Sequence, residues 1–123
     1  MTTETFVEFT FEAAHALPPF APLHGHSFKA ALYLRGDPDP VYGWSHNLYE
    51  VEKVIAEVKQ SVDHRYLNDF IEAPSIENVS RWLWSQFEPR IPGLDRLTLS
   101  RGRDGSAEGC TCTRAERVAA QAA

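Results

Sequence analysis

The sequence has few cysteines, no excess of basic residues and no long apolar run, and each shortage excludes a class of protein. Its two cysteines, Cys110 and Cys112, are two residues apart on an expected strand, so they cannot form the disulfide framework of a small secreted protein. Twelve Lys and Arg against 17 Asp and Glu give a net charge of −5, which is unfavourable for binding nucleic acid or an anionic membrane. No apolar run approaches the roughly 20 residues that span a bilayer. Residues 1–4 lack the layout of a signal peptide, so we expect a cytoplasmic protein.

The length of 123 residues and the hydrophobic content of 43% are typical of one domain with a modest core. We expect this domain to occupy residues 1–114, followed by a frayed or loosely helical Ala-rich tail at 115–123. Alternating apolar and polar residues predict strands at 5–13, 24–35, 97–101 and 110–114. Three prolines predict that 16–23 is a loop outside the sheet.

Apolar residues at helical spacing predict two helices between the second and third strands. The first runs from Leu48 to Val62 after Asn47 as N-cap, and the second starts after Ser75 and stops before Pro89. The order strand, strand, helix, helix, strand, strand favours an α+β fold with a four-stranded antiparallel sheet and both helices on one face. Such a sheet has two open edges, which we expect a homo-oligomer to close.

The tripeptide His24-Gly25-His26 is the most informative pattern in the chain. Residues i and i+2 of a strand project from the same face, so both imidazoles point to one place. His15 ends the first strand, and antiparallel pairing can bring it opposite this pair. Three neutral imidazoles predict a Zn²⁺ site with one coordination position open for water or substrate. The alternative is that these are partly buried structural histidines with hydrogen-bond partners.

Asp63 and His64 form a second candidate pair, after the first helix. A carboxylate beside a histidine can orient the ring and produce an acid or base near neutral pH. The alternative interpretation is a surface dipeptide that stops the helix. His46 has no neighbouring candidate residue in the sequence, and we interpret it as a surface or cap residue.

Several segments resemble, in the same order, those of the 6-pyruvoyl- and 6-carboxytetrahydropterin synthases. They are Phe11-Glu12-Ala13-Ala14-His15, Leu23-His24-Gly25-His26-Ser27-Phe28, Gly43-Trp44, Asn47-Leu48, Asp63-His64-Arg65-Tyr66-Leu67-Asn68-Asp69, Glu77-Asn78-Val79 and Trp82-Leu83-Trp84. The resemblance covers residues 5–114 and implies a T-fold, whose subunits join edge to edge into a barrel. It also implies a small-molecule substrate and a trimer or hexamer with active sites between subunits. By the same resemblance His15, His24 and His26 hold zinc, and Asp63 with His64 transfers protons.

The sequence departs from this family at two functional positions. Phe20 stands where the family has a catalytic cysteine, and Phe has no acid–base group; the nearby Glu12 has the parity of the opposite strand face from His15. Arg101 stands where a glutamate anchors the guanidine-like edge of the pterin, and a guanidinium offers no acceptor to that edge. An inward-pointing Arg101 suits a carboxylate or phosphate, the alternative being a strand-end arginine that reaches solvent.

Ser75 and Glu77 are further candidate substrate-binding residues, in a Ser75-Ile76-Glu77 stretch that is altered from the family pattern. We therefore expect a zinc-dependent lyase or cyclase of this family that acts on an anionic hydroxy- or carbonyl-bearing small molecule other than a standard pterin. One base suffices for retro-aldol cleavage, dehydration or internal cyclisation. The alternatives are a true tetrahydropterin synthase acting on dihydroneopterin triphosphate, and a non-catalytic zinc-binding oligomer.

Overall fold

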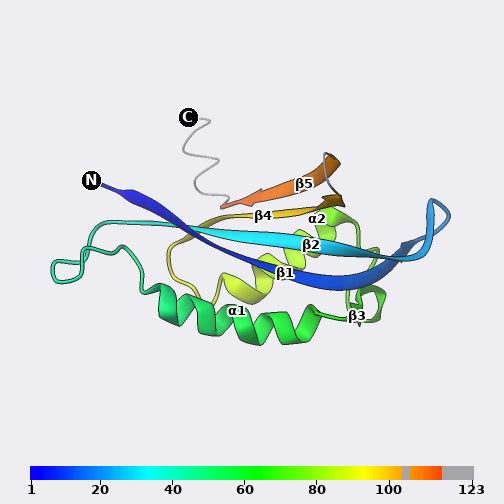
Figure 1. Cartoon of the computed structure of the whole chain (residues 1–123), viewed down its shortest axis with the longest axis horizontal. Helices are drawn as coiled ribbons and strands as arrows, with labels where there is room; N and C mark the ends of the chain where they lie inside the picture. The colour runs from blue at the N-terminus through cyan, green and yellow to red at the C-terminus, as the bar shows by residue number, and fades with distance from the viewer. Residues whose placement is uncertain (104–105, 115–123) are drawn as a thin grey trace.

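The computed structural model describes residues 1–103 and 106–114, which form a five-stranded sheet and two α-helices (Figure 1). The strands are β1 (Thr3–Leu17), β2 (Ala21–Gly36), β3 (Arg65–Tyr66), β4 (Leu94–Arg103) and β5 (Ser106–Thr113). The helices are α1 (Leu48–Val62) and α2 (Ile76–Phe87), and a short 3-10 helix spans Leu67–Asp69. The predicted tail at 115–123 lies outside the described residues. Within 1–103 and 106–114, no helix is long and apolar enough to cross a membrane.

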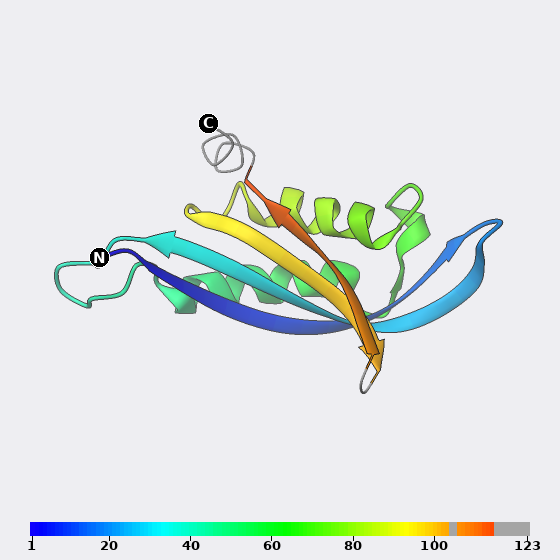
Figure 2. The ribbon, with the colours of Figure 1, turned by 90° about the horizontal axis from the view of Figure 1, so that it is seen from above.

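Both helices pack on one face of the sheet, as the strand and helix order predicts. The sheet order is β3-β1-β2-β4-β5, and the pairings of β1 with β2, β2 with β4 and β4 with β5 are all antiparallel. The helix α1 contacts β1, and α2 contacts β4 and β5, so the strands lie across two neighbouring helices (Figure 2). The predicted caps are present: Asn47 Oδ1 accepts the Tyr49 N–H at 3.0 Å, and Ser75 Oγ accepts the Asn78 N–H at 3.1 Å.

The core lies between this face of the sheet and the helices. Its side chains come from the strand positions that share parity and from the apolar stripes of both helices. Fully buried members include Phe11, Phe28, Leu32, Leu34, Leu97 and Leu99 of the sheet and Val62, Val79, Leu83 and Phe87 of the helices.

The sheet has one strand more than the four we predict. Strand β3 pairs in parallel with Ala13 and Ala14 of β1 through Arg65 and Tyr66 alone. A pairing of two residues leaves no alternating pattern in the sequence, which is why periodicity misses it. Its consequence is that the Asp63-His64 dipeptide lies next to the β1 edge.

The prediction that 16–23 is a loop outside the sheet is wrong. Strand β1 continues to Leu17 and β2 begins at Ala21, so only residues 18–20 form the turn. The register shifts between His15 and Leu17, and Pro22 has no register partner on β1. A proline is compatible with a strand at such an irregularity because no ladder hydrogen bond needs its missing N–H.

Truncating the core should show how much the helix layer contributes to stability. Phe87 is wholly buried and meets the ring of Phe9 edge to face, with centroids 5.8 Å apart. We expect Phe87→Ala to lower the free energy of unfolding by about 3–5 kcal/mol, since it leaves a cavity between α2 and the sheet. Urea denaturation measures the loss, and Gln86→Ala, at an exposed neighbouring position, serves as the control. Equal stability of the two variants would contradict this packing.

Candidate metal centre

Three histidines meet on the helix-covered face of the sheet, where β1 and β2 approach their turn. His15 and His24 are register partners across the β1–β2 pair, and His26 is the partner of Ala13. One nitrogen from each ring lies within 4.8 Å of the other two. His15 is buried, and the other two histidines are half-buried. Antiparallel pairing therefore brings together the side chains that the sequence predicts as ligands.

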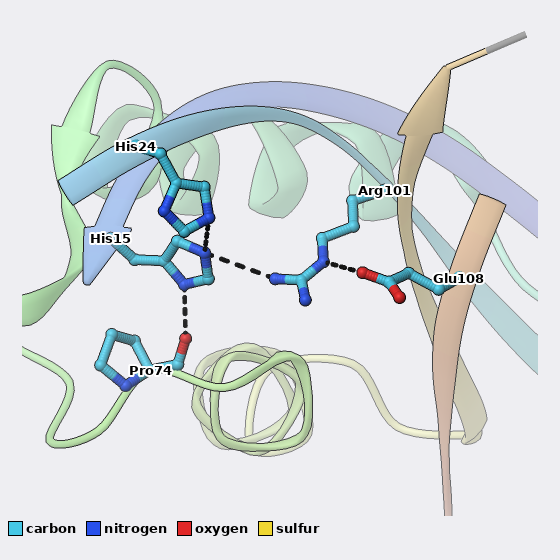
Figure 3. A network of polar contacts seen from close by, with 5 residues as sticks. All are labelled: His15, His24, Pro74, Arg101 and Glu108. Carbon is cyan, nitrogen blue, oxygen red and sulfur yellow. Dashed lines mark hydrogen bonds and ion pairs between the residues drawn. The ribbon is translucent and has the colours of Figure 1, made fainter. Parts of the chain in front are cut away.

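The hydrogen bonds of the rings leave lone pairs facing one another. His15 Nδ1 lies 2.7 Å from the Pro74 carbonyl oxygen, and His24 Nδ1 lies 2.7 Å from that of Pro22 (Figure 3 shows the first). A carbonyl only accepts, so each Nδ1 carries the proton and each Nε2 a lone pair. These two Nε2 atoms are 3.0 Å apart. Two lone pairs at this distance repel each other unless a cation or a proton lies between them.

His26 separates the metal interpretation from the structural alternative. Its Nε2 atom is buried and has no hydrogen-bond partner among the described residues. A structural histidine would be expected to have one, because an unpaired buried polar atom costs about 1–3 kcal/mol. The donor set, two oriented lone pairs and an unpartnered nitrogen, fits a metal ion held by imidazoles.

The surroundings of His15 and His26 favour the neutral, metal-binding form of these two rings. Burial lowers the pKa of His15 below its usual 6.5, and the nearby His24 and Arg101 add to this effect. Burial also lowers the pKa of His26, with the Arg101 guanidinium as the next largest cause. A positive charge close to an imidazole disfavours its protonation.

Arg101 extends from β4 into this cluster. Its Nη1 lies 3.4 Å from His15 Nε2, and its Nε donates to Glu108 Oε1 at 2.8 Å (Figure 3). The Arg101 side chain is 17% exposed and that of Glu108 is 69% exposed. Parity along β4 predicts this inward direction for Arg101, whereas no pattern in the sequence predicts its contact with Glu108. Glu108 is the register partner of Arg101 on β5, and the sequence does not reveal that register.

Asn68 is a second residue whose part in the site the sequence does not reveal. Its amide oxygen accepts the Ala16 N–H and its amide nitrogen donates to the Ala16 carbonyl, both at 2.9 Å. This pair of bonds holds the backbone directly after His15, at the register shift of β1. Asn68 and the Pro74 carbonyl together orient the buried His15.

The predicted proton-transfer pair lies at the β1 edge. Asp63 Oδ1 accepts the Glu12 N–H at 2.8 Å, and Asp63 Oδ2 is 3.1 Å from His64 Nδ1. The His64 side chain is 78% exposed, and no hydrogen bond among the described residues joins it to the three-histidine cluster. His64 and His26 nevertheless both line one open pocket of about 630 Å³, together with Glu12, Ser27 and Tyr66.

The remaining candidate residues lie elsewhere. Ser75 caps α2, and Glu77 lines a separate pocket of about 330 Å³ with Arg81, Cys110 and Cys112. Substrate binding by Ser75 and Glu77 stays a prediction. Phe20 is at the tip of the β1–β2 hairpin and is 91% exposed.

Comparison with known proteins agrees with this fold. The family model described as 6-pyruvoyl tetrahydropterin synthase matches residues 4–112. The chain belongs to the 6-pyruvoyl tetrahydropterin synthase family. This confirms the resemblance carried by the histidine and Asp-His motifs.

Individual relatives in this family carry different names. A dihydroneopterin monophosphate aldolase of Pyrococcus furiosus is 31% identical over 80% of this chain and 90% of its own. A 6-carboxy-5,6,7,8-tetrahydropterin synthase of Synechocystis is 33% identical over 91% and 89%. The solved 6-pyruvoyl tetrahydropterin synthase of Caenorhabditis elegans superposes with a TM-score of 0.81 at 21% identity, covering 94% of this chain and 97% of that one. The T-fold is therefore confirmed, and the family's enzymes include lyase- and aldolase-type activities.

Removing the unpartnered nitrogen tests the metal centre. We expect His26→Ala to lower affinity for Zn²⁺ or Co²⁺ by at least about 100-fold, because three ligands fall to two. His46→Ala, outside the cluster, is the matched control and should bind as the wild type does. Competition with a chromophoric chelator measures both affinities. Unchanged binding by His26→Ala would mean that the metal is held elsewhere.

The Asp63 carboxylate should make stability depend on pH. Its pKa lies below the ordinary 3.8, chiefly because it accepts the Glu12 N–H, with His64 contributing. A carboxyl whose pKa falls on folding stabilises the fold above its unfolded pKa, and loses this effect as the pH falls through the folded value. We expect the melting-temperature advantage of the wild type over Asp63→Asn to shrink from about pH 5 towards about pH 3. Glu52→Gln, at an exposed site on α1, is the control; an advantage that acid leaves unchanged would refute the assignment.

Proposed function

We propose that this protein is a zinc-dependent lyase that breaks a carbon–carbon bond of an anionic, hydroxylated small molecule by a retro-aldol reaction. The observation that carries the proposal is the convergence of three imidazole nitrogens beside the Arg101 guanidinium. His15, His24 and His26 would hold the metal. When bound there, zinc acts as a Lewis acid that polarises a hydroxyl or carbonyl oxygen.

Arg101 selects the charge of the substrate. A guanidinium pairs with carboxylate or phosphate through two parallel N–H donors, and it offers no acceptor to the amino groups of a pterin. Glu108 is the neighbouring carboxylate, but it is occupied by Arg101 Nε. These contacts support a substrate with its negative group next to the reacting oxygens.

His64, oriented by Asp63, transfers the proton. In a retro-aldol cleavage the base removes the hydroxyl proton, and that C–O becomes a carbonyl as the adjacent carbon–carbon bond breaks. The electron pair passes to a carbon that is conjugated with a C=O or C=N group of the substrate, and this carbon is then protonated. His64 can accept the first proton and return it to carbon, so the reaction needs no second acid–base group. This matches a chain that has Phe20 at the family's cysteine position.

The exposed position of His64 supports an oligomeric site. In the trimers or hexamers expected for this fold, a neighbouring copy would bring its His64 to the metal pocket. The strands β3 and β5 are the edges available for such pairing.

A tetrahydropterin synthase acting on dihydroneopterin triphosphate is the second candidate. The 33% identity to a 6-carboxy-5,6,7,8-tetrahydropterin synthase favours it. Arg101 argues against this candidate, because a guanidinium offers no acceptor to the pterin's N–H groups. A non-catalytic zinc-binding oligomer is the third candidate, and turnover of a substrate by the zinc-loaded protein would exclude it.

Product analysis separates these functions. Zinc-loaded protein is incubated with dihydroneopterin monophosphate and, separately, with dihydroneopterin triphosphate, and products are followed by mass spectrometry. A retro-aldol gives two fragments whose masses add up to that of the substrate, whereas the synthase reaction releases triphosphate. Fragments from the monophosphate would place the activity beside that of the Pyrococcus relative, and triphosphate release would establish the second candidate. If neither substrate reacts, non-pterin hydroxylated phosphates and carboxylates are tested next.

The proton-transfer assignment has its own test on whichever substrate turns over. We expect His64→Ala to lower kcat by about 10²–10⁴-fold while the zinc content stays unchanged, because the base is lost and the ligands are kept. His46→Ala controls for removal of an imidazole outside the site, and His24→Ala for loss of the metal. Full activity of His64→Ala would contradict the role.

A further inference from the structure

We infer that the Arg101–Glu108 pair couples metal binding to anion binding, so that an oxyanion and the metal ion each strengthen the binding of the other. The inference deepens the proposed function and rests on its metal site. It assigns Glu108 as a positioning residue, whose carboxylate accepts from Arg101 Nε.

The guanidinium of Arg101 connects a carboxylate on one side with a ligand on the other. Its Nε donates to Glu108 Oε1 at 2.8 Å, and its Nη1 lies 3.4 Å from His15 Nε2. His15 Nε2 is the atom with the lone pair, since His15 Nδ1 is used by the Pro74 carbonyl. Arg101 therefore donates toward the same lone pair that a metal ion requires.

Two consequences follow for a bare metal ion. It must displace the Arg101 contact from His15, and it then faces a fixed positive charge at short range. Glu108 offsets this charge only in part, because its side chain is 69% exposed and lies on the far side of the guanidinium. The metal alone therefore binds against an electrostatic penalty.

A bound oxyanion removes this penalty. Phosphate or carboxylate has several acceptor oxygens, so one oxygen can contact the metal while another accepts from Arg101. Glu108 holds Nε and leaves Nη1 directed at His15, as Figure 3 shows. By thermodynamic linkage the anion then raises metal affinity by the same factor by which the metal raises anion affinity.

The position of Glu108 is set by the backbone of β5. Glu108 and Arg101 are register partners, and the next residue, Gly109, packs so closely that an added Cβ would lie 2.9 Å from the Leu99 carbonyl oxygen. This close approach of β5 to β4 fixes the strand that carries the carboxylate. The cross-strand pair thus belongs to the fold and needs no induced movement to form.

Metal titrations with and without a soluble phosphate-like anion test the coupling. The affinity of the full-length protein for Zn²⁺ is measured by chelator competition in methylphosphonate and in chloride of equal ionic strength. We expect methylphosphonate to tighten zinc binding by about tenfold or more in the wild type. Arg101→Gln should abolish this gain and bind zinc in chloride at least as tightly as the wild type. Arg35→Gln, at an exposed arginine of β2, should keep the full gain.

Glu108→Gln tests what the Glu108 carboxylate contributes to zinc binding. It removes the charge that offsets Arg101, so zinc binding in chloride should weaken about threefold or more, whereas Glu52→Gln should leave it unchanged. Circular dichroism of each variant checks that the fold is intact. The absence of a methylphosphonate effect in the wild type, or an equal effect in Arg101→Gln, would overturn the inference while the metal site stands. Failure of the wild type to bind zinc would overturn both this inference and the proposed function.

Discussion

The register of β1 against β2 is the constraint on which the candidate site depends. It places His15 opposite His24 and brings His26 onto the same face, with one irregularity between His15 and Leu17. A slip of one residue would turn the His15 side chain to the other face of the sheet. The two hydrogen bonds between Asn68 and the Ala16 backbone, with the bond from His15 to the Pro74 carbonyl, hold the strand end against such a slip. The elements after α1 therefore stabilise the geometry of ligands that precede it.

Much of this arrangement is readable from the sequence because it follows from short-range rules. A residue's own parity in a strand, or its position at the start of a helix, decides several of these features. They are the alternation in β1 and β2, the caps Asn47 and Ser75, and the inward direction of Arg101. What the sequence conceals are pairings between distant segments. Three such pairings join parts of the chain that share no sequence pattern. They are the two-residue strand β3 on β1, the hydrogen bonds between Asn68 and Ala16, and the cross-strand pair Arg101–Glu108. The error at 16–23 has a different origin, since Pro18 and Pro19 lie in the short turn and only Pro22 lies in a strand, where it has no register partner on β1.

The same geometry explains why some ring nitrogens of the three histidines lack a hydrogen-bond donor. In a structural cluster each ring would donate one proton and accept another. Here the backbone carbonyls of Pro22 and Pro74 fix where the protons of two rings lie, and the third ring has an unpartnered nitrogen. The cost of these facing lone pairs is one that a metal ion would remove. Stability and function thus oppose each other at this end of the sheet.

The candidate metal site draws its side chains from two separate pairs of strands. All three histidines come from β1 and β2, whereas the charged pair beside them comes from β4 and β5. Position 101 is no part of the β1–β2 pairing, and the carbonyls that orient His15 and His24 belong to Pro74 and Pro22. The Arg101 guanidinium places a positive charge beside the cluster, and Glu108 on the adjacent strand accepts from its Nε. The charge beside the cluster can therefore differ without any change in the β1–β2 pairing that places the three histidines.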